Sequence, residues 1–326
     1  MINTLYRHLI NNQIVWALIL AAIALLLWEI KAILAALFIA FIITSSLYPV
    51  VNFLKRNGIP KVLAVLISYI AVLIILGVLI FPLLPFIVSQ VQSLIEVFPK
   101  LINNASLTFG IDLDVSKVRS FIGSSIDSWG RNAFSLTGRI FGNLFLTLTV
   151  FIVSLYLMID YEKIEKSIAS LFSKDHEVKV ISTVRQVELK LGAWLRGQII
   201  LSFTVGVITY VALYFLNIPY ALPLALLAGF LEIIPTLGPI ISAIPAVIVA
   251  LTISPAMAAI IIGVYSVIQI AENNLLVPQI MRKAVGLNPV VIIVAILVGG
   301  SLMGIIGALL AIPFVSASLI VYRAIK

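Results

Sequence analysis

The C-terminal part of this chain is almost free of charge. Residues 197–281 contain two charged side chains, Glu232 and Glu272, and residues 284–322 contain none. A water-soluble domain has roughly a quarter of its residues charged. These two stretches are therefore predicted to lie in a lipid bilayer, because no solvent-facing surface can be built from them.

Composition extends this prediction to the whole chain. Of 326 residues, 62% are hydrophobic and 10% are charged, and the mean hydropathy is +1.22. That apolar content exceeds what one soluble core can bury, so it excludes intrinsic disorder and ordinary globular enzymes. The net charge of +8 forms no basic stripe with stacking aromatics, so we expect no nucleic-acid partner. We predict an all-α polytopic membrane protein.

The charges that exist are concentrated outside the apolar runs. A helix needs about 20 apolar residues to cross a bilayer core, and proline at 82 and 85 is expected to end the third such run. We therefore predict the following order: residues 1–89 as membrane helices one to three, 90–139 as an extracytoplasmic helical segment, 140–159 as membrane helix four, and 160–196 as cytoplasmic amphipathic helices.

Basic residues in short loops indicate the orientation, because cytoplasmic loops are enriched in Lys and Arg. They gather after the second apolar run, in a late loop, and at the C-terminus: Lys55, Arg56, Lys61, Arg282, Lys283, Arg323 and Lys326. We therefore expect a multi-pass protein of the cell (inner, cytoplasmic) membrane with both termini in the cytoplasm.

Residues 197–326 are predicted to form a transport core with two broken helical hairpins, 220–253 and 288–322. In each, two short apolar halves flank a break rich in glycine or proline. A helical half of 11 residues rises roughly 17 Å, against a bilayer core of about 30 Å. We expect about eight membrane segments, two of them such re-entrant or broken hairpins. Ordinary loops between short, tilted helices are the alternative.

Glu232 is the leading functional candidate. An ionised carboxylate inside a bilayer costs several kcal/mol, so such a residue is by default a functional hypothesis. We predict that it couples transport to a proton or cation; the alternative is that it caps a half-helix or lies at the membrane interface. Four residues of the adjacent break are predicted to join it in coupling or coordination: Pro235, Thr236, Gly238 and Pro239.

Two further groups of residues are candidates. The first is predicted to gate the site or contact substrate: Gln198, Gln269, Glu272, Asn273 and Asn274. Glu272 is expected to start a polar loop at the cytoplasmic boundary, and the alternative for Gln198 and Gln269 is that they hold helices together. The second is expected to form the break of the second hairpin, with close helix packing as the simpler explanation: Gly299, Gly300, Gly304 and Gly307.

The chain lacks the usual signs of enzyme chemistry. It has no cysteine, two histidines, no H-E-x-x-H and no G-x-x-x-x-G-K-[ST], so we predict neither catalysis nor a metal centre. We expect no cofactor beyond an H⁺ or Na⁺ coupling ion. A passive pore or a membrane scaffold is the alternative from another functional class.

Several of these residues carry a resemblance to a known family. The run from Glu232 to Pro239, the group Gln269, Glu272, Asn273 and Asn274, and the glycine series that ends in Ala311-Ile312-Pro313 resemble the autoinducer-2 exporter family of bacterial and archaeal permeases. The resemblance covers nearly the whole chain and is most specific over residues 196–322. It implies a transporter that assembles as a homo-oligomer, in particular a pentamer.

The two lines of reasoning lead to one functional prediction. We expect a secondary active transporter that exports a small polar solute, such as an autoinducer-2-like signal, coupled to a proton or cation by elevator-like alternating access. Because the resemblance also includes relatives associated with exchange of Na⁺ or Li⁺ for protons, a monovalent cation/proton antiporter is the alternative. The expected partners are the solute or cation, the bilayer and further copies of the chain.

Overall fold

The computed structural model of this chain describes residues 13–78, 147–234, 237–281 and 288–326. Over these residues the secondary structure is helical and contains no strand. Five helices in this part of the chain are long and apolar enough to cross a membrane: Lys31–Arg56, Lys61–Val78, His176–Phe215, Pro255–Ile280 and Val290–Ile325. The predicted all-α polytopic membrane protein is thus confirmed. The predicted extracytoplasmic segment, residues 90–139, lies outside the described residues, as do Pro82 and Pro85.

The N-terminal helices are α2 (Gln13–Glu29), α3 (Lys31–Arg56) and the helix Lys61–Val78. The helix Thr147–Ile159 belongs to the same group. Buried hydroxyls connect the last three. The Thr44 hydroxyl contacts the Ser154 hydroxyl at 3.0 Å, and the Tyr69 hydroxyl also hydrogen-bonds Ser154. Mutual hydrogen bonding satisfies these polar groups inside an apolar helix bundle.

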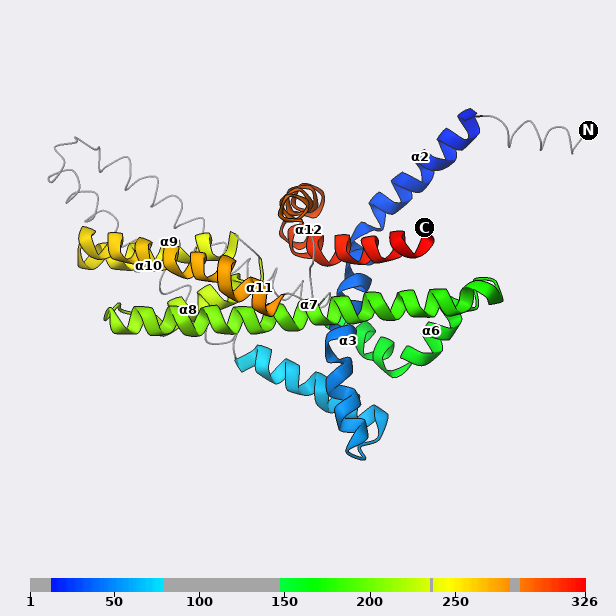
Figure 1. Cartoon of the computed structure of the whole chain (residues 1–326), viewed down its shortest axis with the longest axis horizontal. Coiled ribbons are helices and arrows are strands. Elements are labelled where there is room, and N and C mark those ends of the chain that lie inside the picture. The colour runs from blue at the N-terminus through cyan, green and yellow to red at the C-terminus, as the bar shows by residue number, and fades with distance from the viewer. Residues whose placement is uncertain (1–12, 79–146, 235–236, 282–287) are drawn as a thin grey trace, which may run out of the picture.

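Helix α7 (Lys174–Phe215) is the longest element described and the axis of the fold (Figure 1). Its 42 residues rise about 63 Å, twice the thickness of a bilayer core. We expected a boundary between cytoplasmic helices and a membrane helix at residues 196 and 197, but the chain continues there as one helix. No proline interrupts it, so the end of the charged sequence marks a change of surroundings and not of secondary structure.

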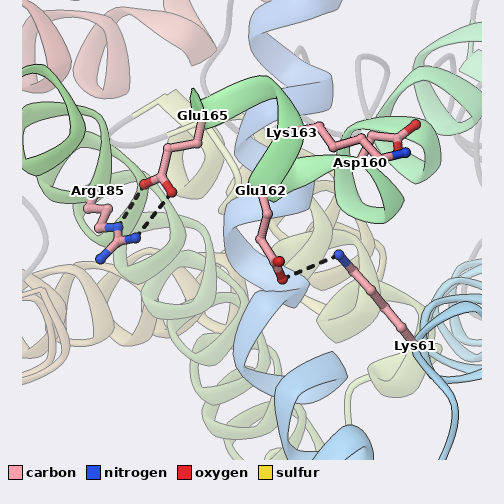
Figure 2. Close-up of polar contacts among 6 residues, drawn as sticks. All are labelled: Lys61, Asp160, Glu162, Lys163, Glu165 and Arg185. Carbon is pink, nitrogen blue, oxygen red and sulfur yellow. Dashed lines mark hydrogen bonds and ion pairs between the residues drawn. The ribbon is translucent and has the colours of Figure 1, made fainter. Parts of the chain in front are cut away.

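The charged first half of α7 packs against α6 (Tyr161–Ala169). Arg185 on α7 forms a bidentate ion pair with buried Glu165 on α6, with N···O distances of 2.7 and 3.1 Å (Figure 2). The Tyr161 hydroxyl donates a hydrogen bond to Glu188. Burial raises the pKa of the Tyr161 hydroxyl, and this hydrogen bond raises it further.

Two weaker ion pairs flank that contact. Lys61 lies 3.5 Å from Glu162 and so connects α6 to the start of the helix Lys61–Val78, while Lys163 lies 2.8 Å from Asp160 within one turn (Figure 2). Exposed pairs of this kind contribute little to stability, about 0–1 kcal/mol. The ion pair between Arg185 and the buried carboxylate of Glu165 is therefore the main electrostatic contact between α6 and α7.

Helix α3 crosses the middle of α7 (Figure 1). A Cβ atom at Gly192 of α7 would lie 2.3 Å from the Ser45 carbonyl oxygen, so the two backbones meet where glycine permits it. One turn later, the Arg196 guanidinium donates to the carbonyls of Ser45 and Ser46 at 3.2 and 3.1 Å. This crossing attaches the N-terminal helices to the second half of α7.

Three antiparallel helices follow α7. These are α8 (Ala221–Leu231), α9 (Leu237–Ile253) and α10 (Pro255–Ala271), followed by a π-helical turn, η1 (Glu272–Leu276), and the short α11 (Val277–Ile280). The second half of α7 packs against α8 and α10, while the middle helix of the three, α9, packs on the other two (Figure 1). Ser254 ends α9 and caps α10, because its side chain accepts the Met257 N–H at 3.0 Å and Pro255 occupies the first turn. We refer to α7 from residue 197 together with α8–α10 as the arm.

The last element, α12 (Pro289–Ile325), folds back on itself. Its backbone departs from helical geometry at Met303 and Gly304, where Gly304 has φ +61°. A Cβ atom at Gly299 would lie 2.3 Å from the Gly307 carbonyl oxygen, although eight residues along a straight helix would separate the two by about 12 Å. Helix α12 is therefore broken at 303–304, within the predicted break, and glycines lie at the closest approach of its two parts.

Candidate functional site

The break between α8 and α9 positions the first candidate, Glu232. Helix α8 ends at Leu231, and Glu232 is its C-terminal cap residue. The chain then turns within a few residues, and the Gly238 N–H donates to the Ile234 carbonyl at 2.9 Å. This is the predicted break of the first hairpin. Pro235 and Thr236 lie outside the described residues, so their predicted roles stay predictions.

Gly238 permits this tight reversal. A Cβ atom at Gly238 would lie 2.0 Å from the Leu231 carbonyl oxygen, a distance that no side chain tolerates. Pro239 follows and is buried, and its carbonyl accepts the Ser242 hydroxyl at 3.0 Å. Gly238 therefore shapes the backbone beside Glu232, while the Pro239 carbonyl already has a partner.

The Glu232 side chain is completely buried in the arm. Neither of its carboxyl oxygens has a hydrogen-bond partner among the residues that the structure describes. Its backbone carbonyl does have one, since the Gln198 side-chain amide on α7 donates to it at 2.6 Å. Gln198 is itself 1% exposed, so this bond lies inside the protein. Glu232 is thus held by its backbone, and no described residue donates a hydrogen bond to its carboxyl group.

Glu272 faces the same interior. It is 3% exposed, and its carboxyl group interacts electrostatically with that of Glu232. The Gln269 side-chain amide donates to Glu272 Oε2 at 3.3 Å. The structure therefore brings Gln198, Glu232, Gln269 and Glu272 together from α7, α8, α10 and η1.

The expected polar loop at Glu272 is wrong. Residues Glu272–Leu276 form a π-helical turn that continues α10 into α11. Five-residue hydrogen-bonded turns of this kind widen a helix locally and often occur at functional sites. The adjacent asparagines point elsewhere: Asn273 and Asn274 are exposed, and the Asn274 side chain donates to the Ile270 carbonyl at 2.8 Å.

The four glycines of the second hairpin belong to a different part of the fold. They lie in α12, which packs on α7, and its residues Leu310 and Ile312 share an apolar cluster with Trp194 of α7. Gly299 and Gly307 touch each other, Gly300 faces the Ala308 side chain, and Gly304 makes the turn. Close packing thus explains Gly299 and Gly307, and backbone conformation explains Gly304, while a side chain at Gly300 would make only an ordinary contact.

Two buried hydroxyls of the arm were not predicted as candidates. Thr209 on α7 and Tyr265 on α10 are buried, and neither hydroxyl has a hydrogen-bond partner within the described part of the chain. The sequence signal is weak, because single Thr and Tyr residues in apolar helices are common. Within the described ranges no group of three His, Cys, Asp or Glu side chains is placed to hold a metal ion.

Comparison with known proteins supports a transport role for this geometry. The model of the family described as "AI-2E family transporter" matches residues 17–326. "Putative transport protein YrrI" of Bacillus subtilis is 28% identical over 300 residues, covering 87% of this chain and 84% of the relative. A second B. subtilis protein, YueF, carries the same description and is 27% identical over 301 residues, covering 86% and 81%.

A more distant relative has a more specific name. The "AI-2 transport protein TqsA" of Escherichia coli is 23% identical over 290 residues, covering 85% of this chain and 80% of the relative. All three alignments extend over most of both chains. The similarity therefore concerns the whole architecture and includes the arm that carries Glu232.

Proposed function

The chain belongs to the AI-2E transporter family, and from this premise we propose that it is a secondary active transporter that exports a small polar solute and uses Glu232 as its coupling residue. One observation carries the proposal: a fully buried carboxyl group, without a hydrogen-bond donor from the described chain, at the break between the two short apolar helices α8 and α9. A group with this environment favours the uncharged form or a bound cation.

The chemistry of coupling follows from that environment. Glu232 takes up a proton while its carboxyl group is enclosed and releases it when a change of the arm admits water. Gln198 holds the Glu232 backbone in place through this cycle, since its bond is to the carbonyl and not to the carboxyl group. Binding of solute and proton to opposite states of the arm would couple their fluxes by alternating access.

Autoinducer-2 is the first solute to test, because the name of one relative specifies it. Proteoliposomes containing the purified protein would be loaded with autoinducer-2, and efflux would be measured with and without an imposed pH gradient. We expect gradient-driven efflux that Glu232→Gln abolishes. Glu29→Gln, at the exposed end of α2, is the matched control and should leave efflux unchanged. Equal efflux by the Glu232→Gln variant would disprove the coupling role.

A monovalent cation/proton antiporter is the second candidate. The observation that favours it is the buried pair Glu232 and Glu272, because carboxylate oxygens suit hard cations. Protein-containing vesicles with an internal pH dye would receive external Na⁺ or Li⁺ without autoinducer-2. Cation-dependent proton release from the vesicle interior would favour the antiporter, and its absence would exclude this candidate. Flux that follows only the solute's own gradient, with no response to a pH or cation gradient, would instead indicate a passive pore.

The assembly and placement of the protein complete the proposal. We place it in the cytoplasmic membrane as a homo-oligomer, a pentamer in particular, with both termini in the cytoplasm. Lys55, Arg56 and Arg323 at helix ends support this orientation. Mass measurement of the detergent-solubilised protein tests the oligomeric number, and protease digestion of oriented vesicles tests the position of the C-terminus.

A further inference from the structure

The arm contains more unpartnered buried polar groups than Glu232 alone. In the described part of the chain, five buried side-chain atoms have no hydrogen-bond partner, and they belong to Thr209, Glu232, Tyr265 and Ser316. Three of these residues lie in the arm, on α7, α8 and α10. Native proteins leave few buried polar groups unpaired, so three in one helical layer call for an explanation.

Thr209 lacks the hydrogen bond that threonine usually makes inside a helix. Threonine in a helix usually donates to the carbonyl four residues earlier, as Thr204 does to Ile200 on the same helix at 2.8 Å. Thr209 makes no such bond and is 1% exposed. It lies eleven residues, three helical turns, after Gln198, which places both side chains on the buried face of α7. Its hydroxyl therefore lies inside the arm and is available to hydrogen-bond a water molecule or another polar ligand.

Tyr265 is the corresponding buried and unpartnered hydroxyl residue on α10. It precedes Glu272 by seven residues, which is two helical turns on the same face and about 10 Å along the axis. Its side chain is 8% exposed and packs in an apolar cluster that also contains Leu213 of α7 and Ile261 of α10. The Tyr265 hydroxyl is thus enclosed among apolar side chains of the arm, where an apolar residue would be the usual choice.

The helix register places these hydroxyls between the acidic pair and the far end of the arm. Gly206 of α7 meets Gly229 of α8, while Gln198 meets Glu232, so the two helices run antiparallel. Thr209 follows Gly206 on α7 and so lies farther from the acidic pair, in the direction of the end of the arm where α9 joins α10. Leu213 and Ile261, one turn further on their helices, then close the interior with apolar side chains.

We propose that Thr209 and Tyr265 bind ordered water inside the arm and line a proton route that leads from Glu232 through the arm up to the apolar side chains of Leu213 and Ile261. Ordered water satisfies buried polar groups when it finds two to four partners, and both hydroxyls can donate and accept. A proton released by the Glu232 carboxyl group passes to the adjacent water, and each hydroxyl accepts one proton while it donates its own. Neither hydroxyl changes charge.

This route rests on the proposed coupling role of Glu232, but its water is testable without transport. Hydroxyl-radical labelling followed by mass spectrometry modifies side chains that contact water, including buried ones. We expect Tyr265 to be labelled despite its burial, and Thr209→Val to reduce that labelling. Tyr214, 62% exposed on α7, is the internal standard. Absence of label at Tyr265, with Tyr214 modified, would show a dry interior and overturn the proposal.

The second test uses proton flux and stability together. Tyr265→Phe removes one oxygen and keeps the ring. If the hydroxyl binds proton-conducting water, proton flux in autoinducer-2-loaded vesicles should fall several-fold to roughly tenfold, the range that one lost hydrogen bond accounts for. If the hydroxyl binds no water, its removal should raise the thermal unfolding midpoint and leave the proton flux unchanged, which would refute the route. Tyr214→Phe is the matched control.

The two proposals fail in different ways. If Glu232→Gln abolishes coupled flux while Tyr265→Phe behaves as wild type, the access route is wrong and the coupling role stands. If Glu232→Gln itself leaves coupled flux unchanged, the proposed function is wrong, and labelling of Tyr265 then shows only a hydrated interior. A larger kinetic solvent isotope effect in Tyr265→Phe than in Tyr214→Phe would support the route, since a purely structural change does not alter proton transfer.

Discussion

The Gln198 side-chain amide on α7 donates a 2.6 Å hydrogen bond to the backbone carbonyl of Glu232, the residue at which α8 ends. The bond lies in the interior, because both side chains are buried. At the end of a helix the last carbonyls lose their partners within the helix. Gln198 supplies one, and the longest helix described thereby fixes the position of the residue whose carboxyl group we propose to carry the coupling proton.

Replacing Gln198 by Met tests this relationship. Met preserves side-chain length but provides no donor, so a buried carbonyl at Glu232 loses its partner. We expect a loss of about 1–3 kcal/mol in unfolding free energy, seen as a lower thermal midpoint in detergent, together with weaker solute efflux. Gln186→Met on the exposed face of α7 is the control. Equal midpoints for the two variants would show that the bond does not stabilise the hairpin.

Gly238→Ala should prevent the reversal between α8 and α9. The added methyl group would lie 2.0 Å from the Leu231 carbonyl oxygen. The atoms that it meets belong to the backbone and cannot rotate away as a flexible side chain could. We expect failure to fold or a destabilisation beyond that of an ordinary core substitution, more than about 3 kcal/mol. In contrast, a Cβ atom at Gly263 of α10 meets nothing within 4 Å, so Gly263→Ala should be neutral or stabilising by up to about 1 kcal/mol. Expression yield and thermal midpoint measure both.

The sequence was sufficient to predict the membrane class, the helical breaks and the carboxylate at the first break. Charge-free runs and clusters of glycine and proline encode these features locally, so they are visible without tertiary information. The first short apolar half expected within 220–253 is observed as α8, Ala221–Leu231. The second break was placed too broadly, at 299–307, because glycines that pack closely and the glycine that turns the chain look the same in sequence.

Tertiary relationships were not visible in the sequence. Glu272 was expected in a polar loop because two asparagines follow it, yet the helix continues there with a π-helical turn and its side chain is buried beside Glu232. The bond from Gln198 to Glu232 joins residues 34 positions apart, a separation that no local pattern specifies. Thr209 and Tyr265 become candidates only when their lack of partners is known.

Alkaline pH should weaken the contact between α6 and α7. Burial raises the pKa of the Tyr161 hydroxyl above its ordinary value of about 10, and the hydrogen bond to Glu188 raises it further. The neutral phenol is thus favoured in the folded state, and its stabilising contribution is fully present below about pH 10. It is lost as the pH rises from there towards the folded-state pKa, because the unfolded chain then binds fewer protons.

The measurement is unfolding of wild type and Tyr161→Phe between about pH 8 and 11, above and below the ordinary tyrosine pKa. We expect wild type to be the more stable protein at the lower pH. The difference in unfolding free energy between wild type and Tyr161→Phe should narrow as the pH rises above about 10. Tyr156→Phe, an exposed tyrosine of the preceding helix, corrects for general effects of the substitution. A difference that stays constant over this range would contradict the prediction.

Glu232 and Glu272 should act as one unit in transport. Both carboxyl groups are buried and interact with each other, while Gln269 binds Glu272 alone. We expect Glu232→Gln to abolish pH-driven efflux and Glu272→Gln to change its pH dependence. The double variant should be no worse than Glu232→Gln, because residues that share one function lose it only once. If the two substitutions instead reduced efflux independently and multiplicatively, Glu272 would have a separate role, such as a gate at the π-helical turn, and the two carboxyl groups would not form a single coupling site.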